Sequence, residues 1–280
     1  MRAALTVLAT GVLTTVQDAG RPGQAALGIG RSGACDRSSY ALANRLVGNI
    51  SGAAVLEATY GGLVLRADCD VVVVTTGARC AGPAPHNAPM TLRAGAELRL
   101  GAPAGGLRTY VAVRGGVAVD PVLGARATDL LAGLGPAVLS VGDVLPVGRS
   151  QEVMPGVDIA AVPDFPAGEV TVNVLPGPRR DWFTDAAWAS LCSQAYTVST
   201  QSNRVGLRLE GEPLERARTG ELPSEGMVRG ALQIPPSGTP VLFLADHPVT
   251  GGYPVIGYVR DDDVDRCAQL RPGQTVRLRE

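Results

Sequence analysis

Short segments in which apolar and polar residues alternate, separated by glycine and proline, dominate this sequence. A period of two places successive side chains on opposite faces of a β-strand. The 36 glycines and 21 prolines spread among these segments favour a β-barrel or sandwich over a parallel sheet with crossover helices. We therefore predict a mainly β protein, with strands at Ala4 to Leu8, Val71 to Thr75, Tyr110 to Val113, Val170 to Leu175, Val241 to Leu244 and Val255 to Val259.

A small unit in which a glycine turn precedes an alternating strand recurs three times, at residues 94–100, 141–147 and 272–278. Its recurrence in both halves of the chain supports a barrel-like architecture. Between Gly148 and Gly168 the chain carries three prolines and no clean periodicity, which is typical of a domain boundary. We predict two β domains, residues 1–155 and 156–280.

Only two segments favour helix. Asp36 can cap a run from Arg37 to Val47, which Gly48 ends. A second run, from about Arg180 to Gln194, carries a broad apolar stripe. We assign the aromatic side chains of these runs to the core rather than to a stacking platform.

The composition excludes several classes of function. A net charge of −1 gives no electrostatic footprint for nucleic acid or an anionic membrane. All 25 basic residues are arginine, which excludes a pyridoxal Schiff base, a biotinyl lysine on this chain and the lysine of a phosphate loop. Five scattered cysteines without a C-x-x-C pair fit reduced thiols, and no apolar run approaches the ~20 residues that cross a bilayer. We expect a soluble, cytoplasmic protein without a signal peptide.

The stretch LGIGRSGACDR places Gly28, Gly30 and Gly33 at the spacing of a dinucleotide-binding loop. A Rossmann loop leaves a buried strand and enters a helix directly, with an acidic residue about twenty positions on. Here GRPGQAA precedes the glycines, the helix begins only after Asp36, and Glu57 alone is a weak match. We interpret the glycines as a turn that brings together Gln17, Asp18, Arg21 and Asp36.

Two further motifs resemble metal sites. The run from Asp261 to Asp265 resembles a diphosphate-metal motif but lacks a second acidic cluster, so we assign it to a solvated turn and helix cap. His86 and His247 lack metal-ligand spacing, and we predict no metal site. His247 is a candidate acid-base group, because imidazole titrates near neutrality and a proline and a Gly-Gly turn follow it. An ordinary polar loop histidine is an equally open alternative.

A series of motifs in one order covers nearly the whole chain: TTVQDAGRPG, SGACDR, ALANRLVGN, LEATYGG, RGGVAVDPVLGARATDL, LPGPRRDWF, QSNRVGLRLEG, LPSEGMVRGALQIPPSGTPVLFLADHPVTGGYPVIGYV and QLRPGQTVRL. These motifs resemble the biotin-dependent carboxyltransferase-like family, which is also known as allophanate hydrolase subunit 2, as KipA-like, or as the C subunit of 5-oxoprolinase. The resemblance implies two cyclophilin-like β-barrel domains with a few short helices, in agreement with the strand pattern.

The resemblance also implies a function shared among several polypeptides. A KipI-like B subunit, together with the A subunit of 5-oxoprolinase, would act with this chain to open 5-oxo-L-proline to L-glutamate with ATP hydrolysis, the chain being inactive alone. Because it has no biotinyl lysine and no ATP loop, we expect no covalent cofactor and expect ATP to bind outside this chain. The alternatives are a carboxyltransferase component of a urea carboxylase or allophanate hydrolase system, and a non-catalytic KipA-like regulator that binds a KipI-like kinase inhibitor.

Candidate site residues in the second domain follow from the chemistry of a small amide, urea or lactam. Such a ligand presents a carbonyl acceptor and N–H donors, and a carboxylate, where present, calls for an arginine fork. Arg204 and Asn203 can supply that recognition, Gln233 can read the amide edge, and a Gly-Gly turn lets Tyr253 approach. The candidates for proton transfer are Glu225, Asp246 and His247.

Gln17, Asp18, Arg21 and Asp36 form the candidate ligand-binding set of the first domain. In that domain LGARATDL stands where LGSRSTDL is usual in the family, and each missing hydroxyl removes a hydrogen bond of roughly 0.5–1.5 kcal/mol. For every candidate in both domains there is a competing interpretation, in which arginines and acids beside glycine turns lock barrel loops through salt bridges.

Overall fold

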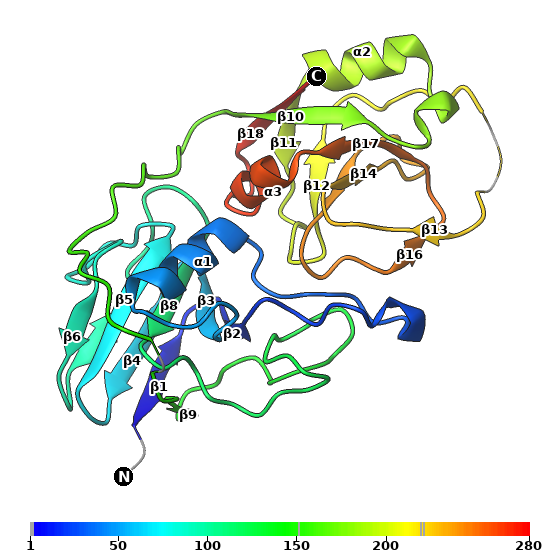
Figure 1. Cartoon of the computed structure of the whole chain (residues 1–280). Coiled ribbons are helices and arrows are strands. Elements are labelled where there is room, and N and C mark those ends of the chain that lie inside the picture. Colours follow the sequence, from blue (N-terminus) through cyan, green and yellow to red (C-terminus); the bar gives the residue numbers. More distant parts are fainter. Residues whose placement is uncertain (1–2, 151, 219, 221) are drawn as a thin grey trace. The chain divides into compact units, whose positions relative to one another are not determined.

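The computed structural model describes residues 3–150, 152–218, 220 and 222–280, and the chain divides into two compact units (Figure 1). Unit 1 comprises the chain up to Arg21, Ser32–Asp129 and Gly133–Phe165. Unit 2 comprises Pro22–Arg31, Leu130–Ala132 and Pro166–Glu280. Two short stretches of the N-terminal half thus belong to the same unit as the C-terminal half.

Unit 1 consists of two antiparallel sheets and one helix. Its elements are β1 (Ala4–Thr10), β2 (Leu13–Gln17), α1 (Arg37–Leu46), β3 (Val55–Thr59), β4 (Leu63–Ala67), β5 (Val71–Gly77), β6 (Met90–Leu92), β7 (Glu97–Arg99), β8 (Arg108–Val113) and β9 (Val144–Pro146). The four-stranded sheet has the order β7-β4-β1-β9, and the five-stranded sheet has the order β2-β3-β8-β5-β6.

Both faces of the five-stranded sheet are covered. Leu56, Val73 and Val111 on one face belong to a buried cluster with apolar residues of the four-stranded sheet, such as Leu5 and Leu65. The opposite face packs against the apolar side of α1. All six residues of β8 are consequently buried, including the polar residues Arg108 and Thr109.

Unit 2 is built around a closed barrel of seven strands in the order β10-β17-β14-β15-β12-β11-β18. Its elements are η1 (Ala25–Leu27), β10 (Val170–Pro176), η2 (Arg180–Trp182), α2 (Asp185–Ser193), β11 (Ala195–Val198), β12 (Gly206–Glu210), β13 (Glu225–Gly226), β14 (Ala231–Gln233), β15 (Val241–Phe243), β16 (Thr250–Gly251), β17 (Val255–Val259), α3 (Asp261–Cys267) and β18 (Thr275–Arg279). Strands β13 and β16 pair as a separate ribbon (Figure 1). The mainly β prediction is confirmed, and the six predicted strands all lie on observed ones.

The first predicted helix is confirmed as α1. Asp36 caps it as predicted: its side chain accepts a hydrogen bond from the backbone N–H of Ser39 at 2.9 Å. The second is divided: η2 covers its start, and α2 begins after Thr184, which caps it through the N–H of Ala187. Within the described ranges, none of the helices combines the length and the hydropathy that a membrane crossing requires.

The run of aspartates, predicted to be a solvated turn and helix cap, forms the start of helix α3: Asp261 and Asp262 are exposed, but Asp263 and Asp265 are buried. Asp263 accepts hydrogen bonds from the backbone and side-chain nitrogens of Asn173 at 2.7 and 2.9 Å. Asp265 is paired with Arg229 at 2.5 Å. These long-range partners, together with the favourable helix dipole at the first turn, offset the cost of burying the carboxylates.

Candidate functional site

The glycine-rich stretch does not form a dinucleotide loop. Gly28 follows the 3-10 helix η1 with φ 74°, and α1 begins nine residues later. Gly30 approaches the carbonyl of His247, where an added Cβ would lie 3.2 Å from the oxygen. The third glycine, Gly33, belongs to unit 1 and has a different role.

Three loops of unit 1, residues 17–21, 32–36 and 126–129, are hydrogen-bonded to one another, and we call them the three-loop cluster. The backbone N–H of Ala34 donates to the Asp18 carbonyl at 3.0 Å. The N–H of Arg126 donates to the Asp18 carboxylate at 2.5 Å, and the Ser32 hydroxyl donates to the Thr128 carbonyl at 3.3 Å. Asp18 therefore connects all three loops.

Gly33 permits the close approach of the first two loops. Its φ is 93°, and an added Cβ would lie 2.9 Å from both the Asp18 carbonyl oxygen and the Gly20 nitrogen. Glycine is favoured there because it tolerates the left-handed region and has no side chain to clash. This contact brings loop 17–21 beside the loop that ends at Asp36.

A pair of glycine substitutions tests this contact. Gly33→Ala is expected to lower the free energy of unfolding by roughly 2–4 kcal/mol, since it adds a backbone clash to an unfavourable φ. Gly28→Ala is the matched control: its φ is 74° but nothing lies within 4 Å of the added Cβ, so about 1–2 kcal/mol is expected. Urea unfolding of both variants measures the difference. Equal losses would contradict the close-approach explanation.

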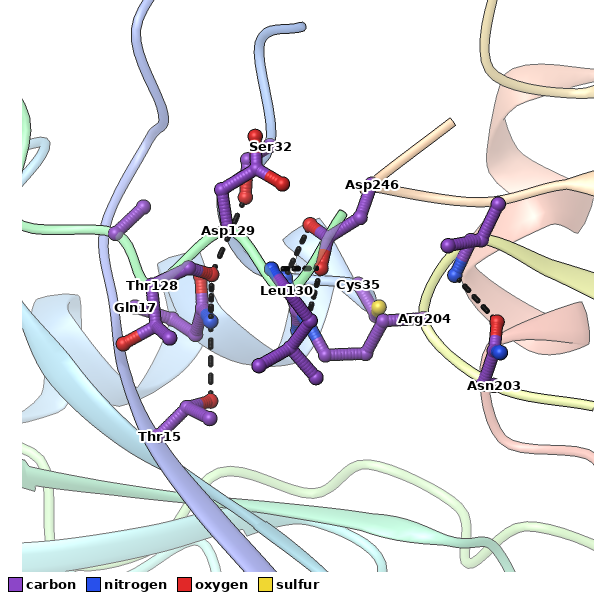
Figure 2. A network of polar contacts seen from close by, with 12 residues as sticks. Thr15, Gln17, Ser32, Cys35, Thr128, Asp129, Leu130, Asn203, Arg204 and Asp246 are labelled. Atoms are coloured by element: carbon purple, nitrogen blue, oxygen red, sulfur yellow. Dashed lines mark hydrogen bonds and ion pairs between the residues drawn. The ribbon is translucent and has the colours of Figure 1, made fainter. Parts of the chain in front are cut away.

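Gln17 is fully buried at the end of β2, and its side-chain nitrogen donates to the Thr15 hydroxyl at 3.0 Å and to the Thr128 carbonyl at 2.9 Å (Figure 2). Within the described residues its carbonyl oxygen Oε1 accepts no hydrogen bond. An unsatisfied buried acceptor costs about 1–3 kcal/mol. A ligand with an N–H group would remove that cost.

Arg21 is the second residue of the cluster whose side chain forms only some of its possible hydrogen bonds. Its Nη2 donates to the Ala127 carbonyl at 2.5 Å, and its Nη1 lies 3.7 Å from the Asp129 carboxylate, too far for a hydrogen bond. Nε and Nη1 donate no hydrogen bond to any part of the chain that the structure describes. A carbonyl oxygen on a ligand would accept from such a donor.

The formal charge of the three-loop cluster does not favour an anion. It contains Asp18, Asp36 and Asp129 against Arg21 and Arg126, which gives −3 + 2 = −1. Asp36 is committed to capping α1, with a nearby serine hydroxyl donating to it at 2.6 Å. Asp18 and Asp36 thus hold loops and a helix together. The predicted residues of this cluster that have unused polar atoms are Gln17 and Arg21.

Sequence reasoning missed two residues of this cluster, Ser32 and Thr128. Thr128 contributes the carbonyl that accepts both from the Gln17 side chain and from the Ser32 hydroxyl. It lies in the LGARATDL motif, which the family resemblance had already singled out. Backbone acceptors of this kind leave no signal in the residue type, so only the motif could have indicated it.

In unit 2, Arg204 and Asp246 form a buried bidentate ion pair (Figure 2). Nε lies 2.9 Å from Oδ2 and Nη2 lies 3.0 Å from Oδ1, and the side chains are 1% and 0% exposed. Asp246 also accepts the backbone N–H of Leu130 at 3.2 Å. The arginine fork predicted for a ligand carboxylate is paired with Asp246 in this structure.

Glu225 is held by a residue that the sequence analysis did not single out. Arg179 Nε donates to Glu225 Oε2 at 3.0 Å, and Nη2 donates to Oε1. Hydrogen bonding to this guanidinium holds the pKa of the Glu225 carboxyl below its usual range. Glu225 is consequently ionised at neutral pH and is not a general acid there. Arg179 follows the Pro-Gly-Pro segment after β10, and only the fold shows that it reaches β13.

Arg179→Gln is expected to raise the pKa of Glu225 toward the ordinary glutamate value, because the stabilising charge and hydrogen bonds are lost. Arg180→Gln provides the matched control, since Arg180 pairs with Asp185 at 2.6 Å instead. Carbon-detected NMR titration of the Glu225 carboxyl measures both. An unchanged pKa in Arg179→Gln, or an equal rise in the control, would contradict the assignment.

His247 is half-buried, and its Nδ1 lies 2.8 Å from the Pro248 carbonyl oxygen. A carbonyl can only accept, so Nδ1 is the donor in this contact. The neighbouring Asp246 side chain forms an ion pair with Arg204. This contact orients the imidazole, and the acid-base role of His247 stays a prediction.

The remaining predicted residues of unit 2 mainly support loops. Asn203 Oδ1 accepts the backbone N–H of Val205 at 2.8 Å. The side-chain nitrogen of Gln233 donates to the Tyr253 carbonyl at 3.2 Å, and the Tyr253 side chain is 44% exposed. Among residues 3–150, 152–218, 220 and 222–280, no group of three histidine, cysteine or acidic side chains is placed to hold a metal ion.

Comparison with known proteins decides the family. A family model described as "Carboxyltransferase domain, subdomain A and B" matches residues 27–280. The chain belongs to this carboxyltransferase-domain family. It is 37% identical to the C subunit of 5-oxoprolinase from Escherichia coli (strain K12), over 97% of this chain and 89% of that protein.

Solved structures share the fold over the full length of this carboxyltransferase-family chain. The crystal structure of TTHA0988 superposes with a TM-score of 0.89 at 36% identity, covering 100% of this chain and 56% of that one. The K. lactis urea amidolyase superposes with a TM-score of 0.90 at 28% identity, covering 99% of this chain and 18% of that one. In both relatives the shared fold is part of a longer polypeptide.

Proposed function

We propose that this chain is the C subunit of an ATP-dependent 5-oxoprolinase that opens 5-oxo-L-proline to L-glutamate. The observation that carries the proposal is the 37% identity to the C subunit of E. coli 5-oxoprolinase, which extends over 97% of this chain and 89% of that protein. Agreement over nearly both full lengths supports the same role in a complex rather than a shared domain alone. The protein would act in the cytoplasm, as its widely spaced cysteines suggest.

We further propose that the chain is inactive alone and acts with the A subunit of 5-oxoprolinase, together with its KipI-like B subunit. The lack of any lysine supports ATP binding on another polypeptide, since a phosphate-loop lysine is not available here. The same fold is part of a longer polypeptide in TTHA0988, of which this chain covers 56%.

In unit 1, we propose that the protein contacts the neutral amide edge of the substrate. Gln17 Oε1 accepts the lactam N–H, and an Arg21 N–H donates to the lactam carbonyl. The unused polar atoms of these two buried side chains support this assignment, and the cluster charge of −1 favours a neutral group over a carboxylate. Asp18 and Asp36 support the loops that carry them.

For unit 2 taken by itself, we propose His247 as a candidate acid-base group, with no placement relative to the contacts in unit 1. The contact of its Nδ1 with the Pro248 carbonyl, which orients the ring, supports that role, whereas Glu225 and Asp246 are each paired with an arginine. The three polar residues predicted for recognition, Arg204, Asn203 and Gln233, would then position the loops around it. The exposed Tyr253 ring would be available to a ligand or partner.

An omission assay tests the function. The purified A and B subunits are mixed with 5-oxoproline and ATP, with and without this chain, and glutamate formation is measured. Glutamate is expected only in the complete mixture. Full activity of the mixture that lacks this chain would contradict the proposal and favour the regulatory alternative.

The second candidate is the carboxyltransferase component of a urea-carboxylating system. The superposition on the K. lactis urea amidolyase over 99% of this chain favours it. Urea also presents an N–H beside a carbonyl, so the same contacts of Gln17 and Arg21 would serve. Transfer of labelled carboxylate from carboxybiotin to urea in the presence of this chain would support this candidate over the first.

A further inference from the structure

Glu57 and Tyr110 lie directly opposite each other on β3 and β8, on the face of the sheet that packs against α1. The Tyr110 hydroxyl donates to Glu57 Oε2 at 2.8 Å. The same carboxylate oxygen accepts the backbone N–H of Cys35 at 2.9 Å, and the Tyr110 oxygen accepts the N–H of Asp36 at 2.8 Å. Two successive backbone N–H groups of loop 32–36 are thus bound by one cross-strand pair.

Both residues of the pair are buried, and a nearby arginine balances the charge of the glutamate. Glu57 is 1% exposed and Tyr110 0% exposed. Arg108, on the same face of β8, has Nε 3.5 Å from Glu57 Oε1, which balances the buried carboxylate. Burial raises the pKa of Tyr110 well above its usual value, so the hydroxyl stays protonated and remains a donor.

The anchored loop 32–36 is hydrogen-bonded to the other two loops of the three-loop cluster. Ala34, next to the two anchored residues, donates its N–H to the Asp18 carbonyl at 3.0 Å. Ser32, with φ 54°, donates to the Thr128 carbonyl, the acceptor that Gln17 also uses. A displacement of loop 32–36 would therefore change the surroundings of Gln17 directly.

We propose that Glu57 and Tyr110 are positioning residues, which fix loop 32–36 on the sheet and thereby hold the three-loop cluster in its ligand-binding arrangement. The identity of the ligand rests on the proposed function, whereas the anchoring of the loop does not. Both residues act through the backbone of loop 32–36, so we expect them to affect binding rather than bond breaking.

Tyr110→Phe in the full chain tests the anchoring. Loss of the acceptor is expected to speed hydrogen exchange of the Asp36 amide by about tenfold. Tyr40→Phe is the matched control, since it removes a buried tyrosine hydroxyl from the same apolar cluster, where that hydroxyl donates to the Ala53 carbonyl at 3.0 Å. The control is expected to leave Asp36 exchange within about twofold.

Kinetics of the reconstituted complex test the effect on binding. Tyr110→Phe is expected to raise KM for 5-oxoproline about tenfold and to change kcat less than about twofold, with Tyr40→Phe altering neither. Glu57→Gln, which retains one acceptor oxygen, is expected to fall between wild type and Tyr110→Phe.

The outcomes separate this inference from the proposed function. Equal exchange rates in the two tyrosine variants overturn the anchoring. Faster Asp36 exchange with an unchanged KM overturns the role in ligand binding. If the wild-type complex does not cleave 5-oxoproline, the proposed function fails, and the exchange comparison alone still decides whether the loop is anchored as described.

Discussion

Arg204→Met is expected to lower the free energy of unfolding of unit 2 by about 3–5 kcal/mol, because it leaves the Asp246 carboxylate buried without its arginine. Both side chains are almost inaccessible, and two hydrogen bonds of 2.9 and 3.0 Å are lost together. Urea unfolding followed by tryptophan fluorescence measures the change, since both tryptophans, Trp182 and Trp188, lie in unit 2.

The double variant Arg204→Met/Asp246→Leu is the control for this prediction. Removing both charges leaves no uncompensated ion, so most of the lost stability is expected to return. The Leu130 N–H loses its acceptor in the double variant, so the recovery should be incomplete. A loss below about 1 kcal/mol in Arg204→Met would show that the pair does not hold the loop and that Arg204 is available to a ligand.

Gln17→Met is expected to reduce kcat/KM for 5-oxoproline in the assembled complex by about 10–100-fold. The variant removes the acceptor proposed for the lactam N–H, and a lost hydrogen bond in a water-excluded site costs about 1–3 kcal/mol. Steady-state glutamate formation measures the change, with complex assembly checked by gel filtration.

Thr15→Val is the matched control for Gln17→Met. It removes the other partner of the Gln17 side-chain nitrogen, at 3.0 Å, but retains the Thr128 contact and the unused oxygen. Its kcat/KM is expected to stay within about threefold of wild type. Equal losses in the two variants would assign Gln17 a structural role and remove it from the proposed site.

Local patterns were sufficient to predict several of the strands and the first helix. Alternating residues located the strands, and Asp36 located the start of α1, because capping depends on residues three positions apart. The sequence also indicated that the glycines do not form a dinucleotide loop. The structure agrees, since η1 and a loop rather than a strand precede Gly33.

Long-range pairing explains what the sequence did not show. Glu57 faces Tyr110 only because β3 and β8 pair in a particular register, and Glu225 reaches Arg179 across 46 positions. The burial of Asp263 and Asp265 in α3 was not predicted, because their partners are distant in sequence. Residue types identified candidate groups, but only the fold showed which were already committed to one another.

The most direct test of the proposed role is ATP-dependent glutamate formation by the A and B subunits, with this chain added in increasing amounts. The rate is predicted to rise from background and to saturate at a fixed molar ratio of this chain to its KipI-like partner, with 5-oxoproline consumed and urea untouched. A rate that is already maximal before any of this chain is added, or consumption of urea in place of the lactam, would contradict it.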